Sequence, residues 1–158
     1  MERRRVLQID GSSKGFNLIE LMTAIAVFGI LAAIAIPNFL AFQPSMRLNG
    51  GAREVMSKLR WARAQAVEQN ATYVVDFPND HSIRVFKDDN LNGTWDSGET
   101  TQTFDIQTDY TGVTFTVSGS NPQFTGRGTA SGATTITVSN TSGSRDVKVT
   151  APGNVKIS

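Results

Sequence analysis

The 158-residue sequence predicts an α+β fold in which a long N-terminal helix packs on an antiparallel β-sheet head. Three observations predict it. An uncharged, apolar run of 22 residues extends from Leu21 to Phe42. Apolar residues then recur at spacings of three and four as far as Asn70, the period of a helix. Beyond Asn70 they alternate with polar residues, the period of a strand. The length suits one domain and is too short for two.

The first half of the helix is expected to cross a membrane. At about 1.5 Å per residue, its uncharged run covers roughly 33 Å, which exceeds a hydrocarbon core of about 30 Å. A buried core helix is the alternative, but the run is apolar on all faces. The basic cluster Arg3–Arg5 favours a cytoplasmic N-terminus, with everything after Phe42 across the membrane. Residues 41–43 offer no small-residue cleavage site, so we expect the helix to be retained.

The second half of the helix is expected to be amphipathic and to end near Gln69-Asn70. Pro37, Pro44 and the Gly50-Gly51 pair should bend it or open a few of its hydrogen bonds. Glu54 and Lys58 form a favourable i,i+4 pair. The stripe that should pack on the head consists of Ala52, Val55, Met56, Leu59, Ala62 and Ala66.

Six segments of the head are predicted to be strands, separated by Gly, Asn, Ser and Pro turns. We expect them to form an antiparallel sheet that covers the helical stripe, with Phe115 and Phe124 in the core. The segments are residues 73–77, 83–86, 113–117, 135–138, 147–149 and 155–157.

The composition excludes most enzyme classes. The chain has no cysteine and a single histidine, His81, so disulfide scaffolds, thiolate zinc sites and cysteine nucleophiles are excluded. A serine or threonine nucleophile would have only this histidine to activate it. A hydrolase based on Asp76, Asp88 and Asp96 lacks a nucleophile, base and orienting group at recognisable spacing. We expect a protein that is not an enzyme, with His81 at the surface.

The residues before the apolar run carry the most specific motif. Lys14 to Leu21 reads Lys-Gly-Phe-Asn-Leu-Ile-Glu-Leu, which resembles the processing motif of type IV prepilins and pseudopilins. The resemblance implies cleavage between Gly15 and Phe16 by a prepilin peptidase and N-methylation of Phe16. Asn17 stands where threonine is commoner in that family. The expected parts are a leader (1–15), a transmembrane and polymerisation helix (16–43), its amphipathic second half (44–70) and a β-rich head (71–158).

Glu20 is the one charge at the entrance of the apolar run, where an unpaired carboxylate is costly. Cleavage would create an α-amino group on Phe16. In a filament of staggered helices, the carboxylate of one subunit can meet that ammonium group of a neighbour, and each reduces the desolvation cost of the other. We therefore expect Glu20 to drive assembly and to set its register.

Residues 53–70 and the strand after them resemble the GspH/FimT class of minor pseudopilins and minor pilins, through Leu59, Ala62, Arg63 and Ala66. The head of the same class is resembled through Phe115, the 124–128 turn, Arg145 and the closing 152–155 segment, so the likeness covers nearly the whole mature chain. The basic residues of the helix are expected to form a solvated face; the alternative is contact with anionic lipid or acidic filament neighbours. These residues are Arg53, Lys58, Arg60 and Arg63.

One loop of the head matches the calcium-binding pattern D-x-[DN]-x-[DN]-G-x5-E over its full length, from Asp88 to Glu99. It lies between strand-like segments rather than between helices, so a solvated polar hairpin is the alternative to a Ca2+ site. Calcium is the one cofactor that the sequence suggests. The candidate ligands are Asp88, Asn90, Asn92, Thr94 and Glu99.

The resemblance implies a minor subunit of a pilus-like filament: a type II secretion pseudopilin near the tip that acts in assembly and protein export, or alternatively a type IV minor pilin in adhesion, motility or DNA uptake. Its implied partners are other pilins or pseudopilins, the prepilin peptidase, the inner-membrane assembly platform and membrane lipid. Nucleic acid is not expected, because residues 16–158 carry 11 basic and 12 acidic side chains. The implied location is the bacterial inner membrane, single-pass, with a periplasmic head that joins the filament after assembly.

Overall fold

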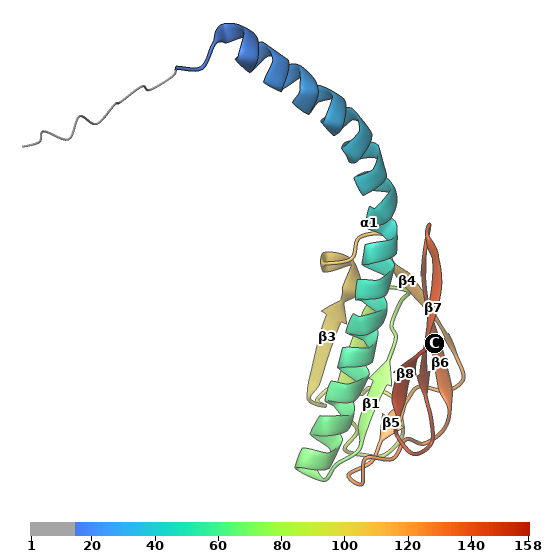
Figure 1. Ribbon diagram of the computed structural model, residues 1–158. Helices are drawn as coiled ribbons and strands as arrows, with labels where there is room; N and C mark the ends of the chain where they lie inside the picture. The colour runs from blue at the N-terminus through green and yellow to red at the C-terminus, as the bar shows by residue number, and fades with distance from the viewer. Residues whose placement is uncertain (1–14) are drawn as a thin grey trace, which may run out of the picture. The chain divides into compact units, whose positions relative to one another are not determined.

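The computed structural model describes residues 15–158 (Figure 1). Most of the expected leader, with its Arg3–Arg5 cluster, lies outside these residues. Helix α1 extends over Leu18–Gln69. It is continuous through Pro37, Pro44 and the Gly50-Gly51 pair, although a proline within a helix lacks one N–H donor and its ring crowds the carbonyl four residues earlier. Residues Ala41–Ser158 form one compact unit, and the helical residues before Ala41 are described separately from it.

The helix ends at the residue that the sequence predicts. Asn70 takes a left-handed conformation, with φ of 47°, which asparagine tolerates better than most residues do. Its N–H donates to the carbonyl of Val67 at 3.3 Å, and the N–H of Ala71 donates to that of Ala66 at 3.1 Å. These bonds satisfy carbonyls that the last turn leaves free, so the chain can reverse into the first strand.

The head contains two antiparallel four-stranded sheets instead of the single sheet expected. One has the strand order β3-β2-β1-β5 and the other β4-β6-β7-β8. The six predicted strands are present, and β3 and β5 were not predicted. The strands are β1 (Tyr73–Asp76), β2 (Ser82–Lys87), β3 (Thr101–Asp105), β4 (Thr114–Ser118), β5 (Gln123–Phe124), β6 (Thr134–Asn140), β7 (Gly143–Val149) and β8 (Val155–Ile157). A short 3-10 helix, Ile106–Thr108, follows β3.

One hydrophobic core joins the second half of α1 to both sheets. The predicted stripe is buried apart from Met56, which is half-buried, and Leu48 extends it by a further turn towards the N-terminus. Phe115 and Phe124 are in the core, as predicted. Because Val, Ile and Phe side chains of both sheets meet the same stripe, burial of apolar area ties the helix to the two sheets at once.

Polar contacts also hold the helix against the second sheet. The side-chain amide of Asn140, at the end of β6, donates to the carbonyl of Pro44 at 2.7 Å. Arg145 of β7 donates to the side-chain oxygen of Asn49 at 3.3 Å. The bond to Pro44 lies beyond the N-terminal end of the buried stripe, so the contact of helix and sheet starts within two residues of Phe42.

Candidate functional site

The first half of α1 is an apolar surface that the chain itself does not cover. Within the described residues, α1 is the one helix long and apolar enough to cross a membrane, and its most apolar window has no buried residue. Phe28 is 72% exposed and Phe39 63% exposed. Soluble proteins rarely leave so large an apolar surface in water. The surface is therefore a candidate for contact with lipid or with neighbouring helices.

The candidate processing and assembly residues lie at the start of this helix. Gly15, Phe16 and Asn17 precede the helix and are exposed. The N–H of Leu21 donates to the carbonyl of Asn17 at 3.1 Å, so Asn17 closes the first turn. Glu20 lies in that turn and is also exposed. A carboxylate in this position interacts favourably with the helix dipole, and it remains available to a partner outside the chain.

The loop from Asp88 to Glu99 is held by its own oxygen atoms. Asp88 is only 3% exposed, and its carboxylate accepts the N–H groups of Asn92 at 3.1 Å and Gly93 at 2.8 Å. The side-chain oxygen of Asn90 also accepts from the N–H of Asn92. The side-chain oxygen of Asn92 accepts both the N–H and the hydroxyl of Thr94. Four of the five candidate calcium ligands thus form one hydrogen-bonded turn.

The fifth candidate, Glu99, closes the loop from its far end. Its two carboxylate oxygens accept the N–H groups of Asp89 at 3.1 Å and Asp96 at 3.0 Å. The side-chain amides of Asn90 and Asn92 donate to Asp96, and these hydrogen bonds lower the pKa of that carboxyl group. Residues 15–158 contain no group of three or more His, Asp or Glu side chains placed to hold a metal. The calcium site stays a prediction.

Arg84 links this loop to the first sheet. Its guanidinium group forms a two-pronged ion pair with Asp76 of the neighbouring strand, through Nε at 2.9 Å and Nη2 at 2.5 Å. Those hydrogen bonds raise the pKa of Arg84. The same guanidinium lies 4.6 Å from the ring centre of Trp95 in the loop, within the range of a cation–π contact.

The basic residues of α1 do not form the uniform solvated face expected. Arg53 and Arg60 are exposed, whereas Lys58 and Arg63 are half-buried. Lys58 pairs with Glu54 at 2.9 Å, as predicted, and also lies 3.9 Å from the ring centre of Phe104 in β3. Arg60 and Arg63 donate hydrogen bonds to backbone carbonyls of the head. The sequence could not reveal this division, because the carbonyl partners lie 65 and 95 residues away.

Close contacts join three segments that carry the sequence resemblance: the helix at Arg63, the turn at Gly128 and the closing segment at Gly153. The Nε of Arg63 donates to the carbonyl of Gly128 at 2.7 Å. Gly153 has a φ of +81°, and a Cβ there would collide with that same carbonyl. Both the backbone conformation and the close approach therefore require glycine. Three parts of the GspH/FimT-like pattern therefore meet at this point: Arg63, the 124–128 turn and the 152–155 segment.

An apolar helix that needs an outside partner, on a head of two antiparallel sheets, defines the type IV pilin-like class of proteins. Two family models match its two parts. The model described as "Prokaryotic N-terminal methylation motif" matches residues 11–36, and "Type II transport protein GspH" matches residues 51–153. The chain belongs to the GspH family of minor pilins and pseudopilins, whose members are structural subunits and not enzymes.

Part of the chain also resembles a curated pilin and a curated fimbrial protein. The chain is 59% identical over 39 residues to the type IV major pilin protein PilA of Myxococcus xanthus and 43% identical over 56 residues to a fimbrial protein of Pseudomonas aeruginosa. These matches cover 25% and 35% of this chain. The chain spans only 18% of the first relative and 36% of the second.

Two solved structures share the fold. The type IV minor pilin FimU of P. aeruginosa superposes with a TM-score of 0.59 at 18% identity, over 74% of this chain and 92% of that one. The minor pseudopilin EpsH from the type II secretion system of Vibrio cholerae gives 0.54 at 10% identity, over 71% of this chain and 96% of that one. Identities this low establish the architecture alone.

Proposed function

We propose that this protein is a minor subunit of a membrane-anchored, pilus-like filament, and that it is a minor pseudopilin of type II secretion that acts at or near the tip in assembly and protein export. One observation carries the proposal. The apolar surface of residues 18–42 is joined to a compact head and overlaps residues 11–36, which match an N-terminal methylation motif. Lipid covers that surface before assembly, and the helices of neighbouring subunits cover it in the filament.

Processing follows from the same arrangement. The prepilin peptidase cleaves between Gly15 and Phe16, and Phe16 becomes the N-methylated first residue. The exposure of both residues ahead of the helix supports this step, because a peptidase needs access to the backbone. The single pass of α1 anchors the chain in the inner membrane with the head in the periplasm. The inner-membrane assembly platform then recruits the anchored chain.

A minor pilin of a type IV pilus is the second candidate. The curated relatives, a type IV major pilin and a fimbrial protein, favour it. The FimU and EpsH structures share the fold and do not separate the two candidates. The GspH model supports the secretion candidate by its description. Both candidates use the same helix, motif and head, so only the activity of the assembled filament separates them.

The function is tested by deletion of the gene in its host. A pseudopilin mutant should accumulate type II substrates in the periplasm and keep its surface pili and twitching motility. A type IV minor pilin mutant should lose piliation or motility and secrete normally. Complementation by the unmodified chain should restore whichever activity is lost. Normal secretion, piliation and motility in the mutant would contradict both candidates.

Processing is tested by intact mass spectrometry of the protein purified from its host membrane. The mass should correspond to residues 16–158 plus one methyl group. A Gly15→Val variant should keep its leader, because a side chain at that position obstructs the peptidase, whereas Gly11→Val should be processed normally. A mature N-terminus beyond Phe42 would contradict the proposal.

A further inference from the structure

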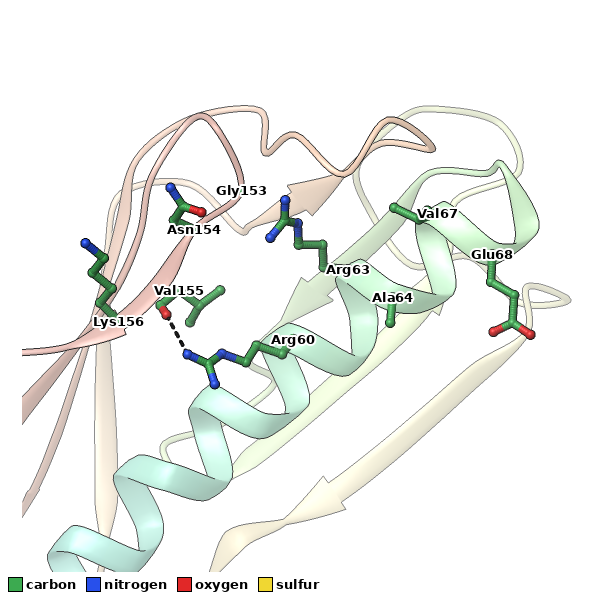
Figure 2. Close-up of a pocket in the computed structure, with 9 residues that line it drawn as sticks. All are labelled: Arg60, Arg63, Ala64, Val67, Glu68, Gly153, Asn154, Val155 and Lys156. Atoms are coloured by element: carbon green, nitrogen blue, oxygen red, sulfur yellow. Dashed lines mark hydrogen bonds between the residues drawn. The ribbon is translucent and has the colours of Figure 1, made fainter.

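An open groove of about 730 Å³ lies between the last turns of α1 and the end of the chain (Figure 2). The helix contributes one wall, and the turn at Gly153 with strand β8 contributes the other. Ala64 and Val67 line its apolar part, and Val67 is 51% exposed. We call this surface the basic groove, because three cationic side chains line it: Arg60, Arg63 and Lys156.

The two arginines are held in place but keep most of their hydrogen-bonding capacity. Arg60 donates from Nη2 to the carbonyl of Val155 at 3.2 Å, as Figure 2 shows, and Arg63 donates from Nε to that of Gly128. A guanidinium group has five N–H donors. Within residues 15–158 each arginine uses one of them, which leaves four per side chain. Such fixed, partly free guanidinium groups suit a carboxylate, which they can bind through two parallel hydrogen bonds.

No carboxylate of the described chain neutralises this charge. The ion pairs within residues 15–158 include none of the three cations. Glu68 is the one acidic residue that lines the groove. Its carboxylate accepts a hydrogen bond from Gln65 at 3.2 Å, and in Figure 2 it points away from Asn154 and Lys156. The groove therefore has a net positive charge that calls for an acidic partner.

We propose that the basic groove binds an acidic segment of a neighbouring filament subunit, with its carboxylates on Arg60 and Arg63 and an apolar side chain against Ala64 and Val67. That the occupant is a neighbouring filament subunit rests on the proposed function. The charge and shape of the groove do not depend on it.

The surroundings of the groove favour a protein over other anions. Arg60 lies 18 residues beyond Phe42, the last residue of the apolar run, which is about 27 Å of helix. Lipid headgroups at the end of that run are therefore distant. Sequence-tolerant nucleic-acid sites combine basic residues with aromatic side chains on which bases stack, and no aromatic residue lines this groove. Its small aliphatic side chains suit a Leu or Val of a peptide instead.

The test uses the full processed chain in detergent micelles and a defined probe. The probe is a fluorescein-labelled peptide of sequence Glu-Asp-Leu-Glu-Asp, and its control has Gln and Asn in place of Glu and Asp. Fluorescence anisotropy measures binding at low salt. The acidic probe should bind and the amide probe should not, and added salt should weaken binding because the contacts are ionic.

Charge reversal locates the site. Arg60→Glu with Lys156→Glu should weaken binding by at least about tenfold. Arg53→Glu reverses an exposed cation of α1 outside the groove and should leave the affinity unchanged. Circular dichroism melting of each variant checks that it is folded. Equal binding by all variants would overturn the proposal. Displacement of the probe by single-stranded DNA or anionic vesicles, at concentrations where a second acidic peptide fails, would also overturn it.

A second measurement addresses the neighbour in the cell. A photo-crosslinking amino acid at Ala64 should form a crosslink to an Asp- or Glu-rich peptide of another subunit of the same filament, identified by mass spectrometry. The same amino acid at exposed Arg53 serves as the control. Probe binding without this crosslink would overturn the filament neighbour as the occupant. Because the peptide assay needs no filament and the gene deletion does not involve the groove, the two proposals fail independently.

Discussion

The two halves of α1 share one backbone geometry and differ in what covers their side chains. Leu31, in the first half, is 56% exposed, whereas Leu59, in the second, is fully buried. The first half is apolar on every face, and the second concentrates its buried residues in one stripe. Uniform hydropathy thus marks a helix whose partners lie outside the chain, and periodic hydropathy marks one whose partner is its own head. Each half should respond to its own substitutions and not to those of the other.

The largest effect is expected in the first half. Glu20→Ala should leave membrane insertion and head stability intact while it weakens incorporation into the filament. It leaves the ammonium group of a neighbour's Phe16 unpaired in an apolar environment, a loss on the order of 3–5 kcal/mol. Crosslinking between subunits measures incorporation. Glu54→Ala is the matched control: it removes a carboxylate from the second half and should cost the head only about 0.3–0.5 kcal/mol. Unchanged crosslinking of Glu20→Ala would refute the pairing argument.

The reciprocal substitution lies in the second half. Leu59→Ala removes a fully buried side chain and should lower the free energy of unfolding of the head by about 2–5 kcal/mol. Denaturant titration followed by Trp61 fluorescence measures this loss of stability. Trp61 reports unfolding because its ring packs edge-on against that of Phe104 in β3, with 5.9 Å between the ring centres. Leu31→Ala should leave this transition in place. A comparable loss from both substitutions would mean that the two halves are not independent.

Calcium should stabilise the head alone. After chelator treatment, a hundredfold excess over Kd should stabilise the head by about 2.7 kcal/mol, because the ion binds only the folded loop. Asp88→Ala and Glu99→Ala should each abolish the gain on calcium addition, and magnesium should do less. Asp109→Ala removes an exposed carboxylate outside the loop and serves as control. An unchanged melting temperature at millimolar calcium would leave the loop a polar hairpin.

The smallest expected effect is a pH response of the same loop. The amide groups of Asn90 and Asn92 lower the pKa of Asp96 below its ordinary value of 3.8. These hydrogen bonds stabilise the folded loop only while Asp96 is ionised. Their contribution is therefore fully present above the unfolded-state pKa of Asp96 and is lost as pH falls through its lower folded-state pKa. Acid titration followed by backbone NMR should show the loop signals shifting below about pH 4. Asp96→Asn should remove this step, and Asp109→Asn should not. A step that persists in Asp96→Asn would assign it to another carboxyl group.

Much of the fold could be predicted because local patterns determine it. The helix end follows from Asn70, and the buried stripe follows from the spacing of its apolar residues. Strand β3 was missed because it is mostly polar and exposed, with Phe104 its one partly buried residue. The division into two sheets was also missed, because alternation shows which residues of a strand are buried but not which strands pair.

Less of the candidate sites could be predicted. The motif around Gly15, Phe16 and Glu20 is contiguous, so the sequence displays it directly. The basic groove depends on Arg60 and Arg63 meeting carbonyls far along the chain, and no local pattern indicates such contacts. In the Asp88–Glu99 loop the sequence shows which oxygen-bearing side chains are neighbours but could not show that backbone N–H groups already occupy the carboxylates of Asp88 and Glu99.

The attachment of α1 to the head also has a mechanical consequence. Hydrogen bonds hold the helix to the head at two distant places, through Asn140 to Pro44 and through Arg63 to Gly128, and most of the buried stripe lies between them. A pull applied at Pro44 along the helix axis therefore shears all these contacts together and does not peel them apart one by one. Contacts loaded in parallel share the force, so the head would resist traction as a single body. A subunit built in this way can transmit a load from its anchor without first losing its fold.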